Sequence, residues 1–212
     1  MIKTNSKNKD LVIIPGARHL NLKNVILRKI YNSLRSYFGL KSNPDSGYKI
    51  LIDRLSKHYD NIYFIKYRRR IINILEPSNT KVIEKTLKTL NKPYDIICFS
   101  FGGHLIQKVF SEKKIKNFPE KLILVSSINA NKKIEFPKKI KVVNIYSRSD
   151  DFVKKMTFLF SGFKGGQHLN NAINIIVDKI SHSELELCVK IPGGKFKGLT
   201  GFRLLEKFLL MN

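Results

Sequence analysis

The chain has 212 residues, 42% of them hydrophobic, which suits one domain with a proper core, and its net charge is +24. No apolar run reaches the roughly 20 residues of a membrane-spanning helix, and the start, MIKTNSKNKDLVIIPG, lacks the long apolar stretch of a signal peptide. We therefore expect a cytoplasmic protein without a transmembrane segment. The cysteines, Cys98 and Cys188, are too few for a disulfide framework or a metal cluster, and we expect no metal and no cofactor.

The positive charge is spread along the whole chain rather than gathered in a tail. The densest cluster is KYRRR at residues 66–70, and no zinc-finger or RNA-recognition motif accompanies it. Abundant lysine, isoleucine and asparagine are typical of an AT-rich coding sequence. We expect weak, salt-sensitive binding to polyanions such as nucleic acid, without sequence preference.

Apolar runs of strand length alternate with amphipathic stretches of helical spacing. The short strands carry β-branched residues on both faces, which is typical of a mostly parallel sheet covered by helices on each side. In chain order, strands are predicted at 11–16, 61–67, 95–100, 121–127, 141–147 and 172–180, and helices at 24–38, 48–59, 78–90, 103–113, 151–160 and 200–212.

No internal repeat or interdomain linker interrupts this alternation. The pattern predicts a single α/β domain over residues 1–212, with about six strands. Residues 20–47, with a helix and a loop at 41–47, are predicted to be an early insertion that either shades the functional site or docks a partner.

A serine stands at the corner between the strand at 95–100 and the following helix, in the segment CFSFGG. A nucleophile elbow puts a serine at a sharp strand-to-helix turn, where small residues are needed two positions before and two positions after. Gly102 meets this need, and Cys98 is small enough where glycine is usual. We predict that Ser100 is a nucleophile; an ordinary turn is the alternative.

A carboxylate and a histidine follow Ser100 in the order that this arrangement needs. A serine hydroxyl requires a base, and the base requires an orienting acid. Asp150 and Asp151 come directly after the strand at 141–147, and His182 follows the last predicted strand. Because ligands of open α/β sheets bind at the carboxyl ends of the strands, we expect these groups beside Ser100.

The chain resembles the α/β-hydrolase family over about residues 10–210. The family pattern has a small residue, then the acid three positions later, then a valine after three more. Ser147, Asp150 and Val153 fit it, which makes Asp150 the expected acid; Asp151 is expected to cap the next helix, where the dipole favours it. The motifs that carry the resemblance are IIPGA (13–17), CFSFGG (98–103), IYSRSDDFV (145–153) and SHSEL (181–185).

The resemblance also implies an oxyanion hole made of two backbone amides. One is that of Phe101, directly after the nucleophile. The other comes from the turn after the first strand, where Ala17 is expected to donate and Arg18 is the alternative. The family usually has His-Gly in this turn; here it reads Pro15-Gly16, so only the glycine is kept. An ordinary Pro-Gly turn is the competing interpretation.

Several other histidines compete with His182 for the role of base. His19 lies beside the oxyanion turn and is the strongest rival. His104 is expected on the helix after the elbow, facing away from the reaction. The remaining candidates are His58 and His168.

Only residues 128–140 separate two strands between which the family often inserts a lid. An open, shallow site is therefore expected, which favours an esterase or thioesterase acting on a small-molecule or lipid acyl substrate. In this hypothesis the Ser100 hydroxyl attacks the acyl carbon, His182 takes the hydroxyl proton, and Asp150 orients the imidazole of His182.

A catalytically silent hydrolase fold, serving as a basic scaffold in a larger assembly, is the alternative. The +24 charge, Cys98 and the missing His-Gly motivate it. A nucleotide-binding domain is disfavoured, because neither a P-loop nor a G-x-G-x-x-G motif follows the first strand.

Overall fold

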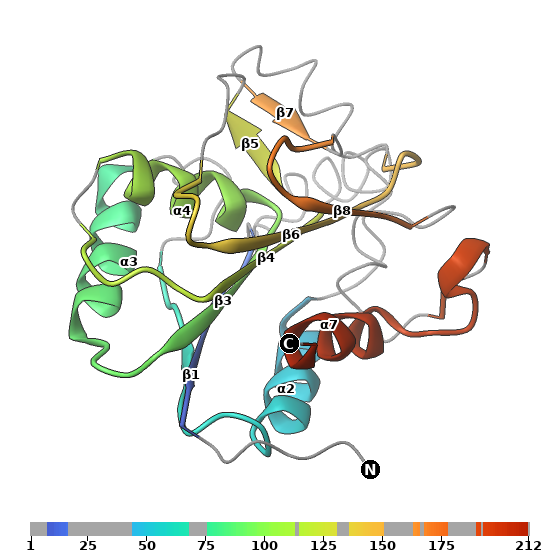
Figure 1. Ribbon diagram of the computed structural model, residues 1–212, viewed down its shortest axis with the longest axis horizontal. Helices are drawn as coiled ribbons and strands as arrows, with labels where there is room; N and C mark the ends of the chain where they lie inside the picture. Colours follow the sequence, from blue (N-terminus) through green and yellow to red (C-terminus); the bar gives the residue numbers. More distant parts are fainter. Residues whose placement is uncertain are drawn as a thin grey trace, which may run out of the picture.

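The computed structural model describes residues 8–16, 44–67, 76–112, 115–130, 136–150, 163–165, 168–177, 190–191 and 193–211. Its centre is a six-stranded, all-parallel sheet with the order β2-β1-β3-β4-β6-β8 (Figure 1). In register, Ile13, Ile97, Ile123 and Val143 cross four neighbouring strands side by side. The strands are β1 (Asp10–Ile14), β2 (Ile62–Phe64), β3 (Tyr94–Phe99), β4 (Lys121–Val125), β6 (Lys141–Tyr146) and β8 (Ile173–Ile176).

Helices cover both faces of this sheet (Figure 1). On one face lie α3 (Pro77–Thr89) and α4 (Phe101–Ser111); on the other lie α2 (Pro44–Leu55) and α7 (Gly201–Leu210). The predicted fold class and its six strands are therefore confirmed. A short 3-10 helix, η2 (Gly194–Phe196), precedes α7, and β5 (Ile128–Ala130) pairs antiparallel with β7 (Phe163–Gly165).

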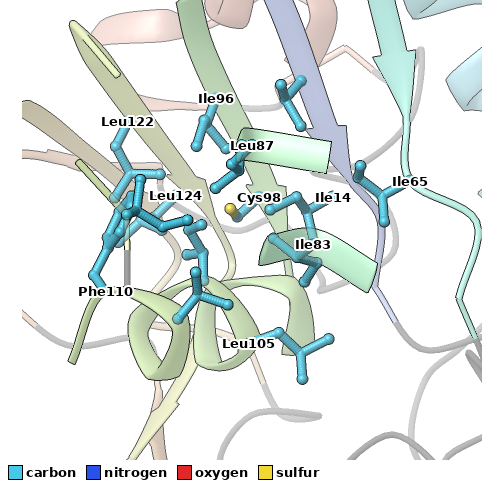
Figure 2. Close-up of a cluster of buried hydrophobic side chains, with 14 of the residues drawn as sticks. Ile14, Ile65, Ile83, Leu87, Ile96, Cys98, Leu105, Phe110, Leu122 and Leu124 are labelled. Atoms are coloured by element: carbon cyan, nitrogen blue, oxygen red, sulfur yellow. The ribbon is translucent and has the colours of Figure 1, made fainter. Parts of the chain in front are cut away.

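Successive residues of β3 point to opposite faces, as in any strand. Ile96 and Cys98 belong to the core under α3 and α4, whereas Ile97 and Phe99 belong to the core under α2 and α7. Figure 2 shows Cys98 among the branched side chains of the first core. Burial raises the pKa of its thiol well above the ordinary value, so Cys98 is a small core residue.

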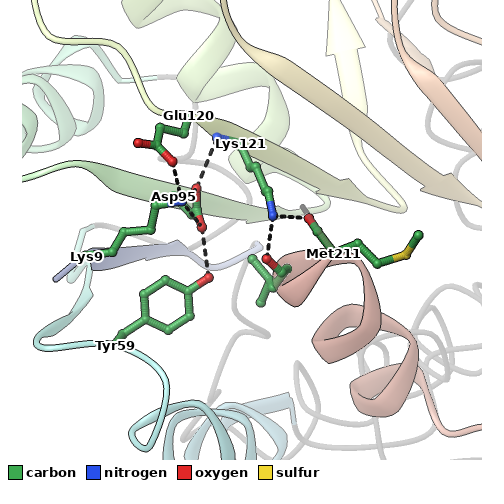
Figure 3. A network of polar contacts seen from close by, with 7 residues as sticks. Lys9, Tyr59, Asp95, Glu120, Lys121 and Met211 are labelled. Carbon is green, nitrogen blue, oxygen red and sulfur yellow. Dashed lines mark hydrogen bonds and ion pairs between the residues drawn. The ribbon is translucent and has the colours of Figure 1, made fainter. Parts of the chain in front are cut away.

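The amino edge of the sheet, where the strands begin, carries a polar network around Asp95 (Figure 3). Asp95 is 1% exposed, and its carboxylate accepts hydrogen bonds from Lys9 Nζ (3.1 and 3.2 Å), the Tyr59 hydroxyl (2.9 Å) and the Lys121 backbone N–H (3.1 Å). Lys9 also pairs with Glu120 at 2.5 Å. Burial raises the pKa of Asp95, and the ammonium of Lys9 opposes that rise. Three donors therefore surround the buried carboxylate.

The same network fastens the last described helix to the middle of the sheet (Figure 3). Lys121 Nζ donates to the backbone carbonyl of Leu209 at 2.7 Å and to that of Met211. Helix ends leave such carbonyls without partners inside the helix, and a cation suits the negative end of the helix dipole. Lys121 is therefore a cap of α7 supplied by β4.

The observed elements depart from the sequence prediction at several boundaries, and two of the departures have a clear physical cause. Residues 44–47, predicted as loop, form the first turn of α2, which begins at Pro44 because proline is tolerated at the first helical position. The β5–β7 pair was missed because three residues are too few to show an alternating pattern. The predicted helices at 24–38 and 151–160, Cys188, and 68–70 of the basic cluster lie outside the described residues.

Candidate active site

Ser100 occupies a strained corner between β3 and α4. Its backbone has φ 49° and ψ −122°, a left-handed conformation that residues with a side chain rarely adopt. Hydrogen bonds hold it there: its N–H donates to the Val125 carbonyl (3.0 Å), and its carbonyl accepts from the N–H groups of Gly103 and Ile128 (both 3.1 Å). The neighbouring strand and the first turn of α4 thus fix the corner from both sides.

Gly102 is required by the close approach of α4 to β1. A Cβ atom at this position would lie 2.5 Å from the carbonyl oxygen of Ile14 and 3.1 Å from that of Pro15. Both obstacles are backbone atoms, which cannot swing aside as the end of a side chain would. The predicted need for a small residue two positions after Ser100 has this packing as its physical cause.

Ser100 and Asp150 both follow strands that end at the carboxyl edge of the sheet. β4 lies between β3, which precedes Ser100, and β6, which precedes Asp150. Asp150 is 2% exposed, and its N–H donates to the Ser147 carbonyl at 3.4 Å in the turn after β6. Asp151 and His182 lie outside the described residues, and their roles stay predictions.

The turn after β1 lies at this same edge. The Gly16 N–H donates to the Tyr48 hydroxyl at 3.2 Å, and the Tyr67 hydroxyl donates to the Pro15 carbonyl. Because the Gly16 amide already has a partner, the next amide, that of Ala17, is the better candidate for the second oxyanion donor. Ala17 and Arg18 lie outside the described residues.

Phe101, whose amide is the first candidate oxyanion donor, is the first residue of α4 and is buried. The N–H groups of the first turn of a helix stand at the positive end of its dipole. Negative charge that develops near the Ser100 corner would therefore be stabilised from this side.

Other histidines of the described segments have different surroundings. Burial, and secondarily Lys108, lower the pKa of His104 to about 4, so it is neutral at pH 7. His58 Nε2 lies 3.4 Å from a carboxylate oxygen of Glu206 on α7. His168 is exposed, and His19 lies outside the described residues.

Two serines that the sequence analysis did not single out follow β4 directly. Ser126 has a left-handed backbone (φ 45°), and its N–H donates to the Ile145 carbonyl at 2.9 Å. The hydroxyls of Ser126 and Ser127 are buried and have no hydrogen-bond partner among the described residues. In the sequence, these serines could have been identified as a pair of hydroxyls directly after the apolar run LILV. In the structure, that run pairs with the strand that leads to Ser100.

Within the described segments, His, Cys, Asp and Glu side chains form no group of three or more that could hold a metal ion. None of the helices described has both the length and the apolar character to cross a membrane.

The sequence matches no protein-family model and no curated protein. Among solved structures, a presumed YdeN-like hydrolase from Pectobacterium atrosepticum is similar at 15% identity with a TM-score of 0.55, covering 97% of this chain and 94% of that one. A carboxylesterase from Mesorhizobium loti matches at 12% identity (TM-score 0.47; 97% and 90% covered). A presumed α/β-superfamily hydrolase from Xanthomonas campestris matches at 10% (TM-score 0.45; 83% and 88% covered).

The all-parallel sheet, the strained serine after β3 and the first of these likenesses define the class of fold. The chain has the α/β-hydrolase fold. At these identities the likeness concerns the fold, and the chemistry has to be argued from the chain's own residues.

Proposed function

We propose that this protein is a serine hydrolase that cleaves a carboxylic ester or thioester through an acyl-enzyme. The observation that carries the proposal is the backbone of Ser100, held at φ 49° by hydrogen bonds to β4, to Ile128 and within α4. Such strain persists only where the surroundings enforce it, and it is typical of functional positions. In a nucleophile elbow this conformation turns the hydroxyl away from the strand, where an acyl group can reach it.

The reaction needs one nucleophile, one base and one orienting acid. Ser100 Oγ attacks the acyl carbon, and His182 accepts its proton and then passes it to the departing alcohol or thiol. Water next attacks the Ser100 ester, gives a proton to His182 and releases the carboxylic acid, and the proton returns to Ser100 Oγ. Asp150 orients the imidazole and stabilises its charged form; the burial of Asp150 after β6 supports this choice.

The negative charge on the tetrahedral intermediate is met by backbone amides. The amide of Phe101 at the start of α4 is one donor, and that of Ala17 after the β1 turn is the other. The connection between β4 and β6, residues 126–140, bears on the substrate class: its described part contains the short strand β5, and its length is too small for a helical lid. We therefore favour an esterase or thioesterase acting on an accessible acyl group.

The test is covalent labelling with a fluorophosphonate probe, which reacts with activated serines whatever the natural substrate. We expect wild type to be labelled and Ser100→Ala to lose the label, with turnover of p-nitrophenyl acetate falling at least about a thousandfold. Ser126→Ala is the matched control, because Ser126 is also buried and left-handed.

Labelling of Ser126 in place of Ser100 would contradict the assignment. A folded wild type that takes no label would instead favour a catalytically silent scaffold. The next experiment would then be to identify the partner that binds its basic surface.

A further inference from the structure

Both peptide groups that flank the Cα atom of Ser100 are held by hydrogen bonds. The peptide before it contains the Ser100 N–H, which donates to the Val125 carbonyl at 3.0 Å. The peptide after it contains the Ser100 carbonyl, which accepts from the N–H groups of Gly103 and Ile128, both at 3.1 Å. Because φ and ψ are the rotations of these two planes about the Cα atom, the three hydrogen bonds together fix the left-handed backbone and the direction of its Cα–Cβ bond.

The donor Ile128 lies one residue further along the chain than a regular ladder would place it. In the parallel pairing of β3 with β4, Ser100 follows the last registered pair and stands opposite Ser126. A regular parallel ladder would therefore give the Ser100 carbonyl the N–H of Ser127. The extra residue coincides with the left-handed backbone of Ser126 (φ 45°), in the manner of a β-bulge. Bulges are common next to active sites, where they re-aim a side chain.

Ile128 is itself anchored by its side chain and by its strand. The side chain is 0% exposed and belongs to the core under α3 and α4. Ile128 is also the first residue of β5, which pairs antiparallel with β7, and it stands opposite Gly165 in that pair. A close-packed core allows little movement of a buried side chain. The Ile128 amide is therefore a donor with a fixed position.

The Ser100 carbonyl shares a peptide plane with the Phe101 N–H, which is the first candidate oxyanion donor. In a trans peptide these two groups point in opposite directions, and no peptide bond in the described part of the chain is cis. The hydrogen bonds from Ile128 and Gly103 to the carbonyl therefore aim the Phe101 N–H the other way, out of the amino end of α4. The Ile128 amide thus bears on both the nucleophile and the donor that would stabilise the oxyanion.

We propose that Ile128 is a positioning residue of the hydrolase, whose backbone N–H holds the Ser100–Phe101 peptide and so orients the nucleophile and the Phe101 amide together. The proposal rests on the proposed function. Ile128 takes no part in making or breaking bonds and acts only through the backbone of Ser100. The short β5–β7 pair, which lies outside the main sheet, thereby supports the geometry of the reaction.

The test compares Ile128→Pro with Ile128→Val. Proline and valine side chains are of similar size, but proline has no N–H to donate, and it is tolerated at the first residue of a strand. With p-nitrophenyl acetate we expect kcat to fall at least about tenfold in Ile128→Pro, less than for outright loss of an oxyanion donor, and KM to stay within about twofold. Ile128→Val, which keeps the N–H, should retain kcat within about twofold of wild type.

A second measurement distinguishes positioning from a merely structural role. Affinity for a phenylboronic acid, which forms a tetrahedral adduct on the serine, should fall in Ile128→Pro by the same factor as kcat. Lower stability alone would not change this affinity in protein that is still folded, and thermal melts of both variants establish that it is. If Ile128→Pro fails to fold, the α-hydroxy acid counterpart of isoleucine at position 128 decides, because its ester removes the N–H and keeps the side chain.

Fluorophosphonate labelling separates the positioning role from the proposed function. Equal kcat in Ile128→Pro and Ile128→Val, or a raised KM with unchanged kcat, would overturn the positioning role if Ser100 still takes the label. The hydrolase proposal would then stay intact. A wild type without label at Ser100 would remove the proposed function and the positioning role together.

Discussion

Polar groups at the two edges of the sheet have opposite environments. At the amino edge, the Asp95 carboxylate is surrounded by Lys9, Tyr59 and the Lys121 amide (Figure 3). At the carboxyl edge, Ser100 and Ser126 have left-handed backbones, and the Ser126 hydroxyl is buried without a partner among the described residues. The same strands therefore end in satisfied groups on one side and in strained or unpartnered groups on the other.

This difference separates what holds the fold from what performs chemistry. Strain and unmade hydrogen bonds lower stability, and proteins keep them mainly where function needs them. Saturated polar networks have no free group to offer a ligand. The contrast predicts that substitutions at the carboxyl edge alter activity more than stability, and that the reverse holds at the amino edge.

Among substitutions that test the difference between the two edges, Asp150→Asn has the largest expected effect on activity. If Asp150 orients the imidazole as proposed, this change should lower turnover about ten-thousandfold, because the imidazole is then held in the wrong tautomer. The melting temperature should change little. Asp151→Asn is the matched control, and the comparison of kcat for p-nitrophenyl acetate decides between the two carboxylates. A larger loss in the control would make Asp151 the acid.

Asp95→Ala tests the amino edge. We expect the free energy of unfolding to fall by about 3 kcal/mol, since buried partners lose a charged acceptor. Fluorophosphonate labelling of Ser100 below the melting temperature should persist. Urea denaturation measures the free energy of unfolding, and in-gel fluorescence measures the labelling of Ser100. Asp53→Ala, on the exposed side of α2, is the control. Lost labelling in a folded Asp95→Ala protein would show that the edges are coupled.

His104 gives a prediction about how the stability of the protein depends on pH. Its folded pKa of about 4 lies below the unfolded value of 6.5, so its contribution to stability is complete above pH 6.5 and is lost as pH falls through 4. The full loss is about 3 kcal/mol, from a difference of between two and three pKa units. His104→Gln should flatten this part of the stability profile, and His168→Gln, at an exposed site, should not. Equal profiles for wild type and His104→Gln would show that the imidazole titrates normally.

The smallest expected effect comes from Ser127→Ala. Removing a buried hydroxyl that has no partner among the described residues should leave stability unchanged or raise it by up to about 1 kcal/mol. Thermal melts measure this, with Ser111→Ala, whose exposed hydroxyl donates to the Lys108 carbonyl, as a control. A drop of more than 1 kcal/mol would mean that the hydroxyl has a partner. Gained stability with lower activity would place Ser127 against the substrate.

The strands and the corner at Ser100 could be predicted from the sequence because their causes are local. Runs such as LVII and IICF are apolar and rich in β-branched residues, and two glycines follow Ser100 within three positions. Pro44 misled the prediction because a proline suits both a loop and the first turn of a helix.

The contacts that hold the turn after β1 could not be predicted, because they join distant parts of the chain. Tyr48 is 32 residues from Gly16, and Tyr67 is 52 from Pro15. The partners of Asp95 come from Lys9, Tyr59 and Lys121, and no spacing relates them. Such pairings depend on which helix covers which face, and that is settled only when the sheet is assembled.

The capping of α7 by Lys121 has a consequence for the order of events on the ribosome. The face under α3 and α4 is covered by segments that lie close together along the chain, so it can close while synthesis continues. The opposite face needs both α2 and α7, and the latter is made some 150 residues after the former. Until α7 emerges and reaches Lys121, the apolar part of the sheet that α7 covers stays exposed on the nascent protein. Chaperones would bind the chain during this period.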